Sequence, residues 1–289
     1  MNIQKIGLIS AVLAVLLLSA CGSVREASGK SQHGSHEAAS SPAGASEHGG
    51  HGGETPKPAS TNMKASFAFG STGLKAKEKS ELTILITDDT GKPVTDYQVN
   101  HEKLLHLIIV NHNLSSFQHI HPAYQGNGKF TVSASFDAGG DYKLIADFIP
   151  TGGSSTTLSQ WVKVAGKEAE HTVLKADAKL RQEVSGKAVE LSLSSTKPKE
   201  DVTLTFTIRD AQTNKEITNL QPYLGAVGHV VILSADAEQY IHVHPLAEKA
   251  TGPVAKFATS FPEAGIYKLW GQFQHNGEVF TVPFVVEVK

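Results

Sequence analysis

Residues 106–122 read HLIIVNHNLSSFQHIHP, and residues 229–245 read HVVILSADAEQYIHVHP. In each stretch a histidine is followed thirteen residues later by His-x-His-Pro, so three histidines recur at identical spacing. A second match follows each stretch, because FDAGGDYKL at residues 136–144 answers FPEAGIYKL at residues 261–269. Internal repetition of this kind sets the architecture before any other feature does. The period of 123 residues suits a whole small domain rather than a solenoid repeat, which predicts two tandem homologous domains.

Each copy is predicted to be an immunoglobulin-like antiparallel β-sandwich, so the fold class is all-β. Between about residues 62 and 166, short apolar or alternating segments are separated by turn signals such as Gly126-Asn127-Gly128. About seven short strands in roughly 100 residues, without a convincing helix, are typical of this sandwich. The second domain is expected over residues 172–289. There Asn276-Gly277 predicts a hairpin that leads into a closing strand from Val279 to Val288.

The first twenty residues have the pattern of an export signal. Lys5 supplies the positive charge, and the apolar run that follows ends in Leu18-Ser19-Ala20-Cys21. This tetrapeptide resembles a bacterial lipobox, which implies that residues 1–20 are a lipoprotein signal peptide and that Cys21 carries lipid. Acyl chains on Cys21 would anchor the protein to a cell membrane, on its extracytoplasmic face. An ordinary secretory signal with a chance cysteine is the alternative.

Cysteine content and charge exclude several classes of site and partner. Cys21 is the only cysteine in 289 residues, so neither a disulfide framework nor a thiolate metal site is possible. Any metal must therefore be held by nitrogen and oxygen ligands. Met63 is the only methionine of the mature chain, so a thioether-rich Cu(I) site is not expected. The formal net charge of -2 gives no electrostatic case for binding nucleic acid.

Residues 21–61 are predicted to be the lipidated cysteine followed by a disordered tether. The segment is rich in Ser, Gly, Ala, His and Glu and has almost no large apolar residue, so it cannot bury enough surface to fold. It also carries histidines beside acidic residues, namely His33, His36, His48 and His51. A flexible His-rich tract can collect Zn or Cu ions weakly, and a solvated spacer is the plain alternative.

The three histidines of the first copy are predicted to meet on one face of a hairpin. If residues 104–110 pair with residues 117–121, paired positions sum to 227 and His106 faces His121. Directly opposed residues share a sheet face, with Cβ atoms about 4.5 to 5.5 Å apart, and His119 lies two positions along on that face. Three neutral imidazoles on a rigid sheet suit Zn(II) or Cu(II). A register slip of one residue would separate them.

The second copy is predicted to repeat this arrangement. Its pairs sum to 473, so His229 faces His244 and His242 shares their face, which predicts a second three-histidine site. Two further histidines, His101 and His112, have no histidine counterpart in the second copy. We expect them to be surface residues or accessory ligands of the first domain.

A fourth ligand position at each site could be filled by water or by a nearby side chain, and the candidates differ between the copies. Aligning the two Tyr-Lys-Leu segments sets Asp147 against Gln272 and Pro150 against His275. Asp147 is therefore the candidate of the first domain, and His275 is that of the second.

The second copy carries further motifs of a known pattern: PYLGAVGH at residues 222–229, His242-Val243-His244-Pro245, and YKLW at residues 267–270. With these motifs the chain resembles bacterial extracytoplasmic immunoglobulin-like lipoproteins of the YtkA-like or copper-resistance-associated kind. The resemblance covers the second domain best and implies a sandwich fold and a role in metal handling. One departure is that the acid expected seven residues after the first histidine is Asp236 in domain 2 but Asn113 in domain 1.

These features give one leading hypothesis and one alternative for the function. The leading hypothesis is a lipid-anchored extracytoplasmic protein that buffers or delivers Zn(II) or Cu(II) through two three-histidine sites, with a metal-transport or acceptor protein as partner. The alternative is a non-catalytic cell-surface interaction module whose histidines are structural, because a buried histidine can simply hydrogen-bond across a hairpin. An enzyme is not expected: a three-histidine zinc site could activate water, but the sequence shows no clear general base beside the triads.

Overall fold

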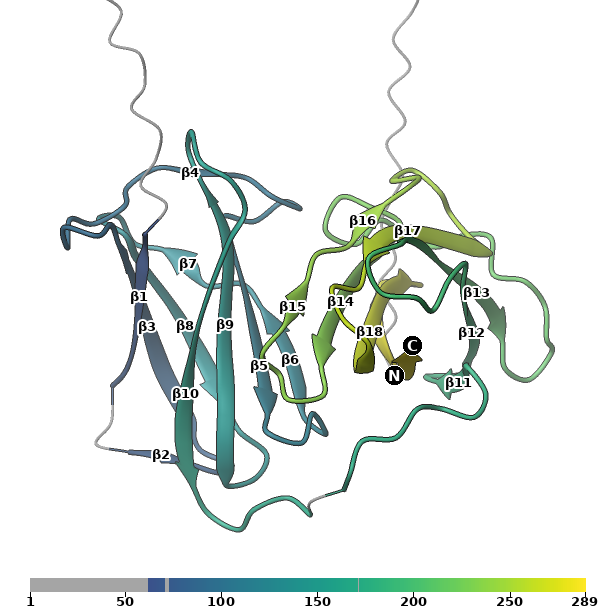
Figure 1. The fold of residues 1–289 in the computed structure, drawn as a ribbon, viewed down its shortest axis with the longest axis horizontal. Coiled ribbons are helices and arrows are strands. Elements are labelled where there is room, and N and C mark those ends of the chain that lie inside the picture. The colour runs from purple at the N-terminus through teal and green to yellow at the C-terminus, as the bar shows by residue number, and fades with distance from the viewer. Residues whose placement is uncertain (1–61, 71–72, 171) are drawn as a thin grey trace, which may run out of the picture. The chain divides into compact units, whose positions relative to one another are not determined.

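The computed structural model describes residues 62–289 except residues 71–72 and 171, and the described residues all belong to one compact unit. The predicted signal peptide, Cys21 and the His-rich tether lie outside the described residues. The regular elements of the described part are nineteen strands, and none is a helix, which confirms the all-β fold class (Figure 1). Within the same residues there is no apolar helix of membrane-spanning length.

The first sandwich has ten strands in two sheets. One sheet has the order β1-β3-β8-β7, and the other has the order β2-β10-β9-β5-β6, with β4 paired to β9 (Figure 1). The strand bounds are β1 Lys64–Phe69, β2 Leu74–Lys75, β3 Lys79–Thr87, β4 Tyr97–Gln98, β5 Leu105–Asn111, β6 Phe117–Ile120, β7 Ala123–Tyr124, β8 Lys129–Ser135, β9 Gly140–Pro150 and β10 Thr156–Ala165. All pairings except that of β2 with β10 are antiparallel, as an immunoglobulin-like sandwich requires.

The second sandwich has nine strands in two sheets, with the orders β11-β12-β13-β17-β16 and β15-β14-β18-β19. The bounds are β11 Arg181–Val184, β12 Lys187–Leu193, β13 Asp201–Asp210, β14 His229–Ser234, β15 Tyr240–Ile241, β16 His244–Pro245, β17 Val254–Ser260, β18 Gly265–His275 and β19 Glu278–Val288. The predicted hairpin is present: β18 and β19 are joined by Asn276 and Gly277, whose φ angles of 54° and 78° suit a tight turn.

Strand β5 is apolar on both faces, and the two faces have different partners. Leu105, Leu107 and Ile109 point into the core of the first sandwich, as one face of a sandwich strand should. Ile108 and Val110 point the other way and are also fully buried. They pack with residues of the second sandwich, in a cluster completed by Leu114, Ile145, Val231, Leu233, Ala237 and Trp270. The outer faces of the β5–β9 and β14–β18 pairs are therefore buried against each other.

The repeated Tyr-Lys-Leu segments form a tyrosine corner in each sandwich. The hydroxyl of Tyr142 donates to the carbonyl oxygen of Ala138 at 3.1 Å, and that of Tyr267 donates to the carbonyl oxygen of Glu263 at 2.9 Å. Both rings are buried, and both hydrogen bonds return to the residue four positions upstream. This bond ties the start of β9 or β18 to the preceding loop, which explains why the segment is repeated.

Removing either hydroxyl should destabilise the protein. Tyr142→Phe leaves the carbonyl of Ala138 without this donor, and the expected loss in the free energy of unfolding is about 1 kcal/mol. Tyr267→Phe should cost at least as much, because this hydroxyl also lies 3.1 Å from the amide oxygen of Gln239. Urea denaturation followed by circular dichroism measures both losses. Unchanged midpoints in both variants would contradict a structural role for the corner.

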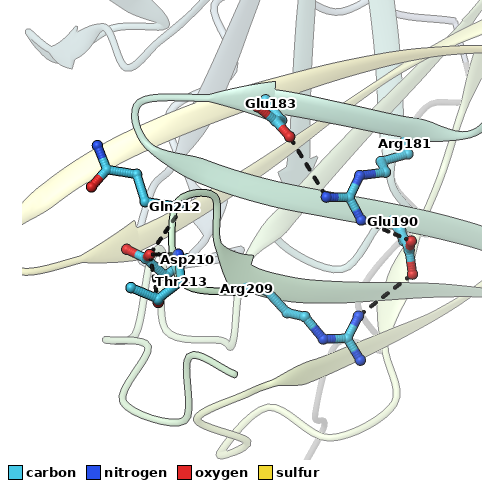
Figure 2. A network of polar contacts seen from close by, with 7 residues as sticks. All are labelled: Arg181, Glu183, Glu190, Arg209, Asp210, Gln212 and Thr213. Carbon is cyan, nitrogen blue, oxygen red and sulfur yellow. Dashed lines mark hydrogen bonds and ion pairs between the residues drawn. The ribbon is translucent and has the colours of Figure 1, made fainter. Parts of the chain in front are cut away.

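The outer sheet of the second sandwich carries a polar network (Figure 2). Arg181 and Arg209 both reach the carboxylate of Glu190, with N–O distances of 3.2 Å and 3.5 Å. Asp210 accepts hydrogen bonds from the backbone and hydroxyl of Thr213, which closes the turn after β13. Exposed ion pairs of this kind contribute about 0–1 kcal/mol each. The network shapes the surface formed by β11, β12 and β13 and contains no histidine (Figure 2).

Candidate metal-binding site

Strands β5 and β6 bring the histidines of the first copy together. The ladder pairs Leu107 with Ile120 and Ile108 with His119, so paired positions sum to 227 as predicted. One ring nitrogen each of His106, His119 and His121 lies within 4.8 Å of the other two. No other group of three potential metal ligands is this compact in the part of the chain that the structure describes.

The ring nitrogens of His106 and His119 that face away from each other both lie against carbonyl oxygens, which assigns the ring protons to these nitrogens. Nε2 of His106 lies 2.9 Å from the backbone carbonyl of Asn100, which can only accept a hydrogen bond. Nδ1 of His119 lies 2.6 Å from the side-chain carbonyl of Gln272, whose amide nitrogen donates to Thr281 at 3.2 Å. Both rings therefore donate outward, as metal-bound histidines commonly do.

This arrangement leaves two bare nitrogens facing each other. Nδ1 of His106 and Nε2 of His119 are 2.9 Å apart, and both carry lone pairs once their partner nitrogens hold the protons. Two lone pairs at this distance repel each other unless a proton or a metal ion lies between them. A shared proton would make one ring cationic, whereas a metal ion would satisfy both nitrogens at once.

The environment keeps the rings neutral, which is the form that binds metals. Burial lowers the pKa of His119 to about 3, although the Gln272 hydrogen bond partly opposes this effect. Burial also lowers the pKa of His121 to about 4, with smaller contributions from His106 and Lys103. The pKa of His106 is lowered mainly by burial as well. At neutral pH none of the three rings has to lose a proton before it can ligate an ion.

His229 comes from the second sandwich but lies beside the histidines of the first. Its ring centroid is 4.8 Å from that of His119 and 5.5 Å from that of His106, and the His106 ring is stacked on it at 7°. His101 also joins the group, with its ring 5.2 Å from that of His229. Burial is the main cause that lowers the pKa of His229 well below its usual value. His229 thus packs against the first copy rather than building a cluster of its own.

The expected second three-histidine site does not form among the described residues, and the reason lies in the path of the chain. Strand β15 keeps the predicted register, since its Ile241 pairs with Ile232 of β14. The chain then leaves this sheet, and His244 pairs with Ala258 in β17 of the opposite sheet. His242 and His244 are consequently exposed, and they form no compact ligand group with His229.

The two fourth-ligand candidates also lie outside the three-histidine group. Asp147 is buried and directly opposite His106 in the β5–β9 ladder, but its carboxylate contacts hydroxyl groups, including that of Tyr240 at 3.4 Å. Burial is the largest effect on Asp147 and raises its pKa. His275 ends β18 and contacts the side-chain oxygen of Asn219 at 3.1 Å.

A cavity of about 210 Å³ lies next to the three-histidine group. Its lining combines residues of both sandwiches: His101, Asp147, Ser155, His229, Tyr240, His242 and His244 are among them. The histidines that the second copy does not assemble into a site therefore line this cavity. His112, in contrast, is exposed, and its ring lies 5.7 Å from that of Trp161.

Contacts between the sandwiches are reciprocal, as expected when two copies of one face meet. Lys143 and Lys268 occupy equivalent positions in β9 and β18. The amino group of Lys268 donates to the backbone carbonyl of Leu114 at 2.8 Å, and that of Lys143 donates to Glu238 at 2.7 Å. Each lysine thus reaches the hairpin turn of the other sandwich. Sequence spacing did not reveal this contact, although the unbroken apolar run of β5 is a signal that both faces are buried.

Comparison with known proteins identifies a family but no established activity. A family profile described as "Domain of unknown function (DUF8832)" matches residues 60–166 and again residues 182–289. No curated protein matches the chain. Among solved structures, the Escherichia coli adhesin FdeC is similar at 18% identity and a TM-score of 0.28, covering 80% of this chain and 65% of its own.

A second similar structure is the Yersinia pseudotuberculosis adhesin InvE, at 12% identity and a TM-score of 0.24, covering 78% of this chain and 60% of its own. The chain thus spans less than two thirds of the length of either adhesin. At these identities and TM-scores the similarity carries no information on what the chain binds.

Proposed function

We propose that this chain, which belongs to the DUF8832 family and carries two of its domains, binds one divalent transition-metal ion, Zn(II) or Cu(II). The ligands are His106, His119 and His121. The observation that carries the proposal is the 2.9 Å separation of Nδ1 of His106 and Nε2 of His119, while the other nitrogen of each ring faces a carbonyl oxygen. We thus propose one three-histidine site, whereas the sequence repeat predicts two.

The donor set selects the class of metal. Three neutral imidazoles without sulfur suit Zn(II) and Cu(II), whereas Ca²⁺ and Mg²⁺ prefer oxygen ligands. Asn100 and Gln272 would act as outer partners that fix the ring orientations, because each accepts the far proton of a ligating ring. We assign binding rather than catalysis, since the compact group consists of histidines and includes no acid that could serve as a general base.

The cellular setting remains a prediction of the sequence. We propose that Cys21 is lipidated and holds the protein on the extracytoplasmic face of a cell membrane. The tether histidines would collect ions weakly, and the buried site would hold one ion more tightly for an acceptor or transport protein.

A second candidate function is an interaction module in which the histidines are purely structural. The observation that favours it is the hydrogen bond from His119 to Gln272, which joins the two sandwiches without any ion. The stacked rings of His106 and His229 would serve the same purpose. This alternative also fits an extracytoplasmic protein with two sandwich domains.

Metal titration of the chain distinguishes these functions. We expect the protein with the four tether histidines replaced by alanine to take up one equivalent of Zn(II) or Cu(II) in a calorimetric titration. His121→Ala should weaken this uptake by about tenfold or more, since even loss of an outer partner costs about 10–100-fold. His112→Ala, which changes an exposed histidine of the same domain, is the matched control and should leave uptake unchanged. No uptake, together with a melting temperature insensitive to metal, would favour the structural alternative.

A further inference from the structure

Two nitrogens stand out among the buried polar atoms of the described residues. Nε2 of His121 and Nε2 of His229 are buried and have no hydrogen-bond partner, and no other buried side-chain polar atom of the described residues shares this condition. Leaving a buried acceptor unpaired costs about 1–3 kcal/mol, so native proteins rarely tolerate it without a reason. Both unpaired atoms belong to imidazole rings of one cluster. A ligand that accepts lone pairs would satisfy both.

The ring spacings among His106, His119 and His121, and from His229 to two of them, are those of imidazoles around a single ion. Zn–N bonds of about 2.0–2.1 Å in a tetrahedral site place ring centroids about 5 Å apart. The centroids of His106, His119 and His121 are 4.7 to 5.2 Å apart. The centroid of His229 is 4.8 Å from that of His119 and 5.5 Å from that of His106. The ring of His229 therefore lies at ligand separation from two of the three rings, those of His106 and His119.

The backbone holds His229 in this place. His229 is directly opposite Gln272 in the β14–β18 ladder, so the two side chains share the face that meets the first sandwich. Gln272 in turn accepts the hydrogen bond of His119. Gly228 lets β14 begin this close to β18, because a Cβ at this position would lie 2.5 Å from Cδ1 of Phe273 and 2.7 Å from the carbonyl oxygen of Gln272.

We propose that His229 of the second sandwich is the fourth ligand of the ion held by His106, His119 and His121, so that the bound ion cross-links the two domains. This inference rests on the proposed metal site and assigns the fourth ligand position, which the three histidines leave open. His229 is stacked on His106 in the structure, so it must turn by a side-chain rotation to point its nitrogen at the ion. The ion would then tie the second sandwich to the first and make its release depend on movement between them.

X-ray absorption of the Zn(II)-loaded chain tests the assignment, with the tether histidines replaced by alanine. The expected spectrum shows four imidazoles for the otherwise unaltered protein and three for His229→Ala, with Zn(II) affinity at least tenfold weaker in the variant. His229→Gln, which keeps a polar side chain, guards against a folding defect and should also show three. His242→Ala is the control, because this exposed histidine belongs to the same sandwich and should leave the count at four.

The possible failures are distinguishable. If the unaltered chain binds Zn(II) with three imidazoles, or if both His229 variants keep four, His229 is not a ligand and the cross-link is wrong, while the three-histidine site stands. If the unaltered chain takes up no Zn(II), the proposed function fails together with the inference. A count that falls to three in the His242→Ala protein would instead place the fourth ligand at His242 and also overturn the assignment.

Discussion

Replacing Trp270 by alanine should lower the free energy of unfolding by about 3–5 kcal/mol, the cost typical of deleting a buried tryptophan. Trp270 is 3% exposed and points from β18 toward the first sandwich. Its ring is stacked on that of Phe117 at a centroid distance of 4.5 Å and an angle of 11°. Trp270 is a large contributor to the contact between the two domains, because Trp buries a large apolar area and stacks specifically.

The same substitution should reach the histidine group. Gln272 lies two positions from Trp270 on the same face of β18 and holds His119 by its hydrogen bond. We therefore expect Trp270→Ala to weaken metal uptake as well as stability, as measured by urea denaturation and calorimetric titration on one sample. Trp161→Ala, at a tryptophan that is 36% exposed, is the matched control and should cost far less. Equal losses in the two variants would show that the buried Trp270 contributes no more than Trp161, whose indole nitrogen donates to Glu238 at 3.3 Å.

Much of the fold could be predicted from the sequence because its signals are local. The duplicated histidine spacing predicts two domains, and the short apolar segments predict strands rather than helices, as the structure has them. Both hairpin registers are also as predicted, since Ile108 pairs with His119 and Ile232 pairs with Ile241. Register follows from the pattern of the two strands and the length of their turn, and both are readable in one stretch of sequence.

The composite site could not be predicted from spacing, because two of its determinants are not local. One is the point at which the chain leaves the sheet. Strand β6 runs to Ile120, whereas β15 ends at Ile241, and His244 then pairs in the opposite sheet. The other is the packing of one sandwich on the other, which brings His229 to His106 and His119. Equal spacing in the two copies therefore does not give equal sites.

Duplication followed by face-to-face packing explains why the histidines gather at one contact. The first hairpin carries its histidines on the outer face of its sheet, β14 carries His229 on the corresponding face of the second copy, and the two outer faces meet. The two copies carry different residues at the equivalent positions 147 and 272, and these two side chains make different contacts. Gln272 orients His119 in the three-histidine group, whereas Asp147 lines the neighbouring cavity near His242. The side chain at position 272 is thus a neutral amide beside the three-histidine group, and the side chain at position 147 is a buried carboxyl group beside the cavity.

Acidification should destabilise the metal-free protein, starting near pH 6.5. The pKa of His119 is lowered to about 3 and that of His121 to about 4, mainly by burial, while an unfolded histidine titrates near 6.5. Below pH 6.5 the unfolded chain binds protons that the folded chain does not. Stability is therefore complete above pH 6.5 and falls as the pH decreases toward 4, by up to about 1.4 kcal/mol per pH unit for each such ring. Asp147 opposes the trend, because its raised pKa lets the folded state take up a proton first.

Urea midpoints measured between pH 7 and pH 5 isolate the contribution of each ring by difference. His119→Asn removes one titrating group, so the stability of this variant should fall less steeply with decreasing pH than that of the unaltered protein. His112→Asn changes an exposed histidine and should keep the original slope. Zn(II) should raise the stability at pH 7 and lose this effect on acidification, because protons compete with the ion for the same nitrogens. Identical slopes in all three metal-free proteins would mean that His119 is not held neutral in the folded state.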